Sequence, residues 1–146
     1  MLKTRATIVI YSTALLVVGF AAGHLFSAAA VQAQSANRVF EMRTYTAPPG
    51  KLTELHARFR DHTMRIFQKH GMQNIGYWQP QDAPDSQNTL IYIIAHKSRE
   101  AAKASWSAFG ADPEWKKVSA ESQVNGRIVE KLASVFMDPT DYSPIK

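Results

Sequence analysis

Three side chains that could bind a small molecule occupy every second position just after residue 40. Glu41, Arg43 and Tyr45 lie in an alternating segment, and side chains two residues apart on a β-strand share one face. A carboxylate, a guanidinium and a phenol side by side can bind an anionic or carbonyl-containing ligand. The same row can instead be an internal Glu–Arg pair that fixes the register of a sheet or a dimer, because buried polar groups are normally paired.

Two histidines are candidates for proton transfer, since histidine titrates near neutral pH. His62 falls on a predicted helix close to its apolar stripe, and His96 ends a predicted strand. Each can equally be a hydrogen-bonding residue of the fold. His56 and His62 are too far apart for the i,i+4 pair of a helical metal site. A lone histidine is a weak signal for haem, so we predict no metal and no cofactor, and the catalytic residues stay unknown.

Two aromatic residues on predicted strands could form the walls of a cavity for a flat apolar ligand. Trp78 and Tyr92 fall at sheet positions where their rings can face such a cavity. Aromatic side chains on strands are more often part of a core. Serine-nucleophile motifs, phosphate-binding loops and carboxylate pairs at catalytic spacing are absent from the sequence.

The elements that must position these residues follow from the hydrophobic periodicity. The pattern predicts strands at 38–46, 72–81, 89–96 and 127–137. It predicts helices at 51–70, with Arg58 on the solvent side, and at 98–110, with a further helical turn starting at Asp112. The order β-α-β-β-α-β predicts an α+β, ferredoxin-like fold with a four-stranded antiparallel sheet and helices on one face.

The uncovered face of this sheet predicts a second copy of the chain. Large side chains point to both faces of the first strand, and the run Leu-Ile-Tyr-Ile-Ile-Ala at 90–95 is apolar throughout. Burial of both faces requires cover on both, and helices supply only one. We therefore predict a two-fold homodimer.

The domain from residue 38 to residue 144 resembles the NIPSNAP family. The stretches that carry the resemblance are 40–46 (FEMRTYT), 49–51, His62, 70–71, 76–78 (GYW), Trp106, Phe109, 112–115 (DPEW), 139–140 and 142–144. The resemblance implies a dimeric α/β-barrel, in which two sheets face each other around a cavity. It implies no settled activity. Proteins of the same broad fold include cofactor-free monooxygenases, haem enzymes and small-molecule isomerases, which is an analogy of fold only.

The N-terminus predicts export. Lys3 and Arg5 precede a long apolar run, and small residues at Val31 and Ala33 suit a signal peptidase, so we interpret 1–33 as a signal peptide and 34–37 as a linker. The protein is then periplasmic or secreted. The alternative is an uncleaved membrane anchor formed by residues 6–26, which would be the chain's contact with a membrane.

Composition excludes several classes of function. The 146-residue chain has a formal net charge of +5 and no cysteine, so thiol catalysis and disulfides are excluded. Its basic residues are scattered, which argues against nucleic acid as a partner. Two hypotheses stay open: a homodimeric module that binds a small apolar or anionic molecule or a partner protein, and a cofactor-free oxygenase or isomerase that uses His62 or the Glu41–Arg43–Tyr45 row.

We expect the exported protein to begin at Gln34, because cleavage after Ala33 satisfies the small-residue preference of the peptidase. Intact-mass analysis of the exported protein checks this. A mass that still includes residues 1–33, found in the membrane fraction, would support the anchor instead.

Overall fold

The alternating segment just after residue 40 forms a central strand of the sheet. The structure is a computed structural model that describes residues 38–146, so the predicted leader (1–33) and linker (34–37) lie outside the described residues. The elements are β1 (Val39–Thr46), α2 (Leu52–Arg58), η1 (Phe59–Thr63), α3 (Met64–Lys69), β2 (Gln73–Trp78), η2 (Asp85–Gln87), β3 (Thr89–His96), α4 (Arg99–Ala111), α5 (Pro113–Glu121) and β4 (Lys131–Met137).

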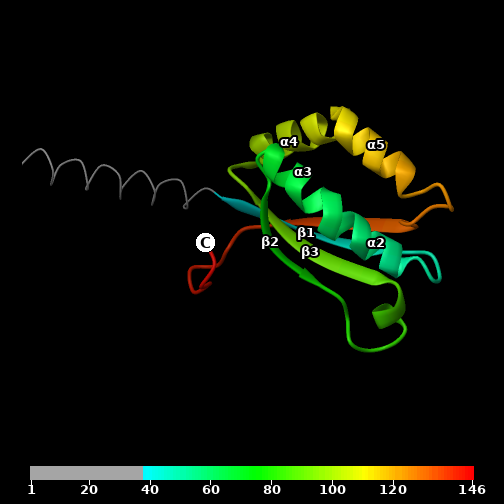
Figure 1. Cartoon of the computed structure of the whole chain (residues 1–146). Helices are drawn as coiled ribbons and strands as arrows, with labels where there is room; N and C mark the ends of the chain where they lie inside the picture. The colour runs from blue at the N-terminus through cyan, green and yellow to red at the C-terminus, as the bar shows by residue number, and fades with distance from the viewer. Residues whose placement is uncertain (1–37) are drawn as a thin grey trace, which may run out of the picture. The chain divides into compact units, whose positions relative to one another are not determined.

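The four strands form one antiparallel sheet in the order β2-β3-β1-β4. Each helical connection therefore crosses over one intervening strand, and both crossovers put their helices on the same face (Figure 1). This confirms the predicted ferredoxin-like α+β architecture. Two strands are shorter than predicted: β2 ends at Trp78, and β4 begins only at Lys131.

The core fills the space between the sheet and its helices. Its centre is a cluster of aromatic rings in edge-on and tilted contact, built on Phe59, Phe67 and Tyr92. Leu55 and Ile66 are fully buried beside them. The apolar stripe predicted for residues 51–70 therefore does face the sheet, and burial of side chains of this size supplies about 1.5–3 kcal/mol each.

The predicted helix at 51–70 contains a π-helical turn, η1, between α2 and α3. Thr63, buried at this turn, donates a hydrogen bond from its hydroxyl to the carbonyl of Arg58 at 3.1 Å. The extra residue in the turn changes the register of the helix, and such turns are frequent at functional sites. The assignment of Arg58 to the solvent side was wrong: only 6% of this residue is exposed.

No helix of residues 38–146 covers the second face of the sheet (Figure 1). The side chains on that face are mostly apolar. We call it the open face. It carries Met42 and Ile93 at its centre, and Trp78, half exposed, towards the β2 edge. Gly76 lies next to Trp78 on this face, and a methyl group at position 76 would overlap the indole. The ring thus lies across the glycine, in the space that a side chain there would fill.

The edge strand β4 is the least covered element of the sheet. Leu132 and Val135, which point to opposite faces, are each about half exposed. The chain then continues into a tail whose Pro139 and Ile145 approach Phe40 at one end of the open face. No helix within residues 38–146 is long and apolar enough to cross a bilayer.

The junction between α3, α4 and α5 is organised by Asp112. This residue caps α5, accepting a hydrogen bond from the Glu114 amide, as the sequence predicted. Its other carboxylate oxygen lies 2.8 Å from Lys69 Nζ and 2.6 Å from His70 Nε2. The hydrogen bonds from Lys69 and then His70 hold the pKa of Asp112 well below its usual range.

We expect Asp112→Asn to lower the melting temperature at pH 6 by several degrees, because asparagine still caps α5 but loses the ionic contacts. A carboxyl with a depressed pKa stabilises the fold above its unfolded value of 3.8 and loses that contribution as the pH falls. The gap between the wild-type and variant melting temperatures should therefore narrow progressively as the pH falls below 3.8. Thermal melts across pH 2–6 measure this, and a gap that widens in acid would contradict it.

Candidate functional site

Glu41 is the most heavily bonded of the predicted site residues. It is 2% exposed and accepts hydrogen bonds from Trp106 Nε1 at 2.7 Å, Ser134 Oγ at 2.6 Å and His96 Nε2 at 3.0 Å. These donors come from α4, β4 and β3, so one carboxylate joins three elements to β1. Burial alone would raise the pKa of Glu41, but the hydrogen bonds and the charge of Arg43 outweigh burial and lower it.

Arg43 lies beside Glu41 on the face of the sheet that the helices cover. Its Nε is 3.5 Å from Glu41 Oε1, and its guanidinium carbon is 4.1 Å from the centre of the Trp106 indole. The internal Glu–Arg pair that we considered for this row is therefore present. A ligand role for the row stays a prediction.

The two tyrosines of the prediction also lie on the helix side. The Tyr92 hydroxyl donates to the Tyr45 hydroxyl at 3.1 Å, and Tyr92 is completely buried. Burial, helped by the neighbouring Tyr45, raises the pKa of Tyr92 well above its usual value. Tyr92 is thus a neutral core phenol in the aromatic cluster. Trp78 points to the open face, so the two rings that we predicted as walls of one cavity lie on opposite sides of the sheet.

His96 is brought to Glu41 by the register of β3 against β1. Its side chain is fully buried, and Nδ1 has no hydrogen-bond partner among the described residues. A neutral ring that donates from Nε2 to Glu41 leaves Nδ1 as an acceptor, which costs less than leaving a buried donor unpaired. This arrangement makes His96 a part of the Glu41 network rather than an exposed strand end.

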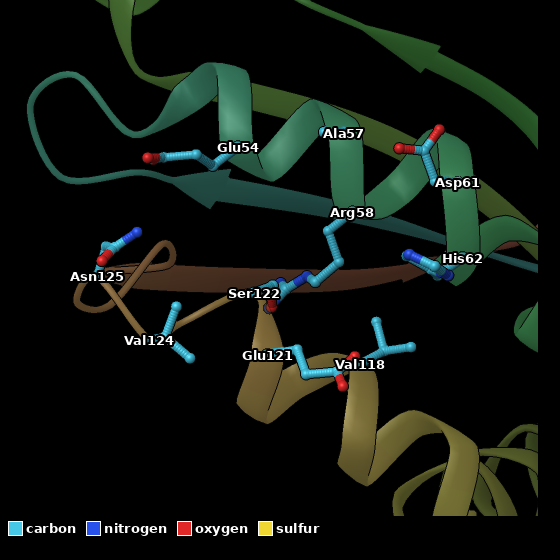
Figure 2. Close-up of a pocket in the computed structure, with 10 residues that line it drawn as sticks. All are labelled: Glu54, Ala57, Arg58, Asp61, His62, Val118, Glu121, Ser122, Val124 and Asn125. Carbon is cyan, nitrogen blue, oxygen red and sulfur yellow. The ribbon is translucent and has the colours of Figure 1, made fainter.

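Of the predicted site residues, His62 lines a pocket on the helical side of the described domain. The pocket has a volume of about 350 Å³ and lies between α2–η1 and the end of α5 with the turn that follows it (Figure 2). His62 is exposed and extends into this space from η1. It lies apart from the Glu41 network, so the structure does not bring the predicted residues together into one site.

Arg58 forms the buried part of this pocket, and sequence reasoning missed it. Its side chain reaches from α2 towards Ser122, whose hydroxyl is 3.5 Å from Nη1 (Figure 2). Nε has no hydrogen-bond partner, and no carboxylate of residues 38–146 lies within ion-pair distance. Burial lowers the pKa of Arg58, and the nearby phenols of Tyr45 and Tyr92 oppose that effect.

One signal in the sequence could have identified Arg58. It follows Leu55 by three residues and directly precedes Phe59, so it borders the apolar stripe on the helix. We assigned it instead to the solvent side of the helix, where charged side chains usually lie. Trp106 and Ser134 carried no comparable signal, because their contact with Glu41 depends on tertiary packing.

Comparison with known proteins agrees with the resemblance seen in the sequence. The sequence model of the NIPSNAP family matches residues 40–144. A NIPSNAP family protein of unknown function from Agrobacterium tumefaciens is 22% identical, with a TM-score of 0.66, covering 76% of this chain and 96% of its own. An uncharacterised NIPSNAP-like domain protein from Burkholderia xenovorans is 18% identical, with a TM-score of 0.65, covering 75% and 90%.

A more distant solved structure widens the range of functions on this fold. SnoaB, a cofactor-independent oxygenase from Streptomyces nogalater, is 14% identical, with a TM-score of 0.51, covering 75% of this chain and 99% of its own. At this identity the likeness concerns the fold alone. No curated protein matches the sequence.

We expect Glu41→Leu to lower the free energy of unfolding by about 3–5 kcal/mol, because it leaves the buried His96, the partly buried Trp106 and Arg43 without their acceptor. Adding Arg43→Met should recover part of that loss, since the guanidinium is then no longer stranded. Urea unfolding at pH 7 measures both. Glu54→Leu, at an exposed carboxylate, is the matched control and should change stability by less than about 1 kcal/mol. Equal losses at positions 41 and 54 would refute a structural role for the network.

Proposed function

The chain belongs to the NIPSNAP family, and we propose a function for it from its structure. We propose that it is an exported homodimer that binds a small molecule on the helical side of each protomer. The observation that carries the proposal is the pocket between α2–η1 and α5. Its volume of about 350 Å³ falls within the range of small-molecule sites. A buried polar group at its base and a π-helical turn in its wall are features common at binding sites.

The open face supports the homodimer. Its central residues Met42 and Ile93 are apolar and only partly covered within one protomer, and Trp78 stands half exposed beside them. Contiguous apolar surface of this kind marks an interaction site in a soluble protein. A second copy related by a two-fold axis would bury the same patch on both chains. The binding pockets lie on the opposite face of the sheet and would stay accessible.

An enzyme of the cofactor-free oxygenase or isomerase type is the second candidate. It is favoured by the position of the His62 imidazole, which lines the same pocket as Arg58. A ligand held by the arginine could exchange a proton with this histidine. In that case His62→Ala would abolish turnover and leave binding intact, whereas a binding protein would have no turnover to lose.

We expect native mass spectrometry and a crystal structure of the purified protein to reveal a molecule bound in this pocket. Ala57→Trp should block its binding, because Ala57 lines the pocket and an indole would fill much of it. Ala104→Trp, on the exposed side of α4, is the matched control. If the molecule still binds to the Ala57→Trp variant, its binding site is not this pocket.

Light scattering should give twice the protomer mass at micromolar concentration. Ile93→Asp should yield monomers, since it would bury a carboxylate without a partner at the centre of the interface. Ala104→Asp should remain dimeric because position 104 is on the helical side. A well-folded wild-type monomer would refute the homodimer.

A further inference from the structure

We propose that the pocket between α2–η1 and α5 binds a small monocarboxylate, whose carboxylate pairs with the guanidinium of Arg58. This inference rests on the proposed function and names the ligand class of the same site. Three properties of the pocket support this ligand class: the unneutralised charge of Arg58, the carboxylates at the rim and the apolar side chains in the walls.

Arg58 is a buried cation that no carboxylate within residues 38–146 neutralises. The residue is 6% exposed, yet none of the ion pairs in residues 38–146 includes it. Among residues 38–146 the guanidinium makes one hydrogen bond, a long one of 3.5 Å to the Ser122 hydroxyl, and Nε has no partner. A buried charge without a counter-ion is costly. The fold therefore carries a cost that an anionic ligand would remove.

The geometry of a guanidinium selects a planar anion. Its N–H groups form a rigid fork that matches two carboxylate oxygens, which a lysine cannot reproduce. The Arg58 guanidinium carbon is also 5.2 Å from the centre of the Trp115 ring, which supports one side of the cation and limits its orientation. The described residues thus leave the hydrogen-bonding capacity of the guanidinium largely unused.

The rim of the pocket excludes highly charged anions. Glu54, Asp61 and Glu121 line the pocket and are exposed, whereas Arg58 lies at its base. A ligand that enters passes these carboxylates and reaches a single buried cation, which balances one negative charge. The second charge of a phosphate dianion or a dicarboxylate would lose its water near Glu54, Asp61 and Glu121 without a partner, and burial of an unpaired charge is costly. The pocket therefore favours a single negative charge over two.

The walls near Arg58 favour an apolar body on the ligand. Val118 is buried at the base of the pocket, and Ala57 and Val124 add further methyl groups. Benzoate and isobutyrate combine one carboxylate with an apolar body that fits a pocket of about 350 Å³. They are suitable probes of the assigned class.

Isothermal titration of the full-length protein with benzoate, isobutyrate and inorganic phosphate tests the assignment. The carboxylates should bind at one site per protomer, and phosphate should neither bind nor compete. Arg58→Met should weaken carboxylate binding by about 10- to 100-fold, as expected for loss of a charge-assisted pair. Arg60→Met, at an exposed arginine two residues away, is the matched control and should leave binding unchanged.

Thermal melts separate a binding role of Arg58 from a structural one. Ligand-free Arg58→Met should melt no lower than the wild type, because methionine removes the cost of the buried charge. A melting temperature well below wild type would make Arg58 a structural residue and overturn the assignment. If Arg58→Met does not fold, Arg58→Lys decides: it keeps the charge but loses the fork, and it should bind benzoate several-fold more weakly.

Two further outcomes distinguish this inference from the proposed function. A neutral molecule could bind in the pocket with an affinity that Arg58→Met does not change. That result would support the proposed binding function and refute the assignment of a monocarboxylate ligand. A pocket that takes neither a carboxylate nor any co-purified molecule would refute both.

Discussion

The buried carboxylate of Glu41 is the interaction on which the domain most depends. A buried charge is tolerable only when its hydrogen bonds are satisfied, and the donors that satisfy this one come from the end of β3, from the middle of α4 and from β4. The edge strand has little apolar cover of its own, so the bond from Ser134 is one of the few side-chain ties that hold it in place. A single acidic residue on β1 thus ties β3, β4 and α4 to the centre of the sheet and lies beside Arg43.

The two faces of the sheet have different chemistry. The helix side contains the aromatic core, the Glu41 network and the pocket at Arg58, whereas the open face carries Met42, Ile93 and Trp78. Alternation along each strand produces this separation, because neighbouring residues point in opposite directions. Two residues can therefore be adjacent in sequence and still lie in different environments. One can bind a ligand on the helix side while the next contacts a second copy on the open face.

The sequence predicted what depends on local pattern and missed what depends on long-range packing. Alternation identified β1, and the capping residues Ser98 and Asp112 correctly marked the starts of α4 and α5. The partners of Glu41 are 55 to 93 residues away along the chain, and no periodicity encodes them. We assigned Trp78 and Tyr92 to one cavity, but they point to opposite faces. The register of β2 against β3 shifts at Asn74–Gly76, and the sequence does not indicate this shift. Arg58 was wrongly assigned to the solvent side, because we gave more weight to its charge than to its position beside the apolar stripe of the helix.

The contact between Gly76 and Trp78 restricts how this part of the sheet can evolve. The indole occupies the volume in which any other side chain at position 76 would begin. A first substitution at position 76 displaces the ring and disturbs the open face, whereas a smaller residue acquired first at position 78 makes larger residues at 76 acceptable. Among descendants of this chain the two positions should therefore change in a fixed order, with the tryptophan lost before the glycine.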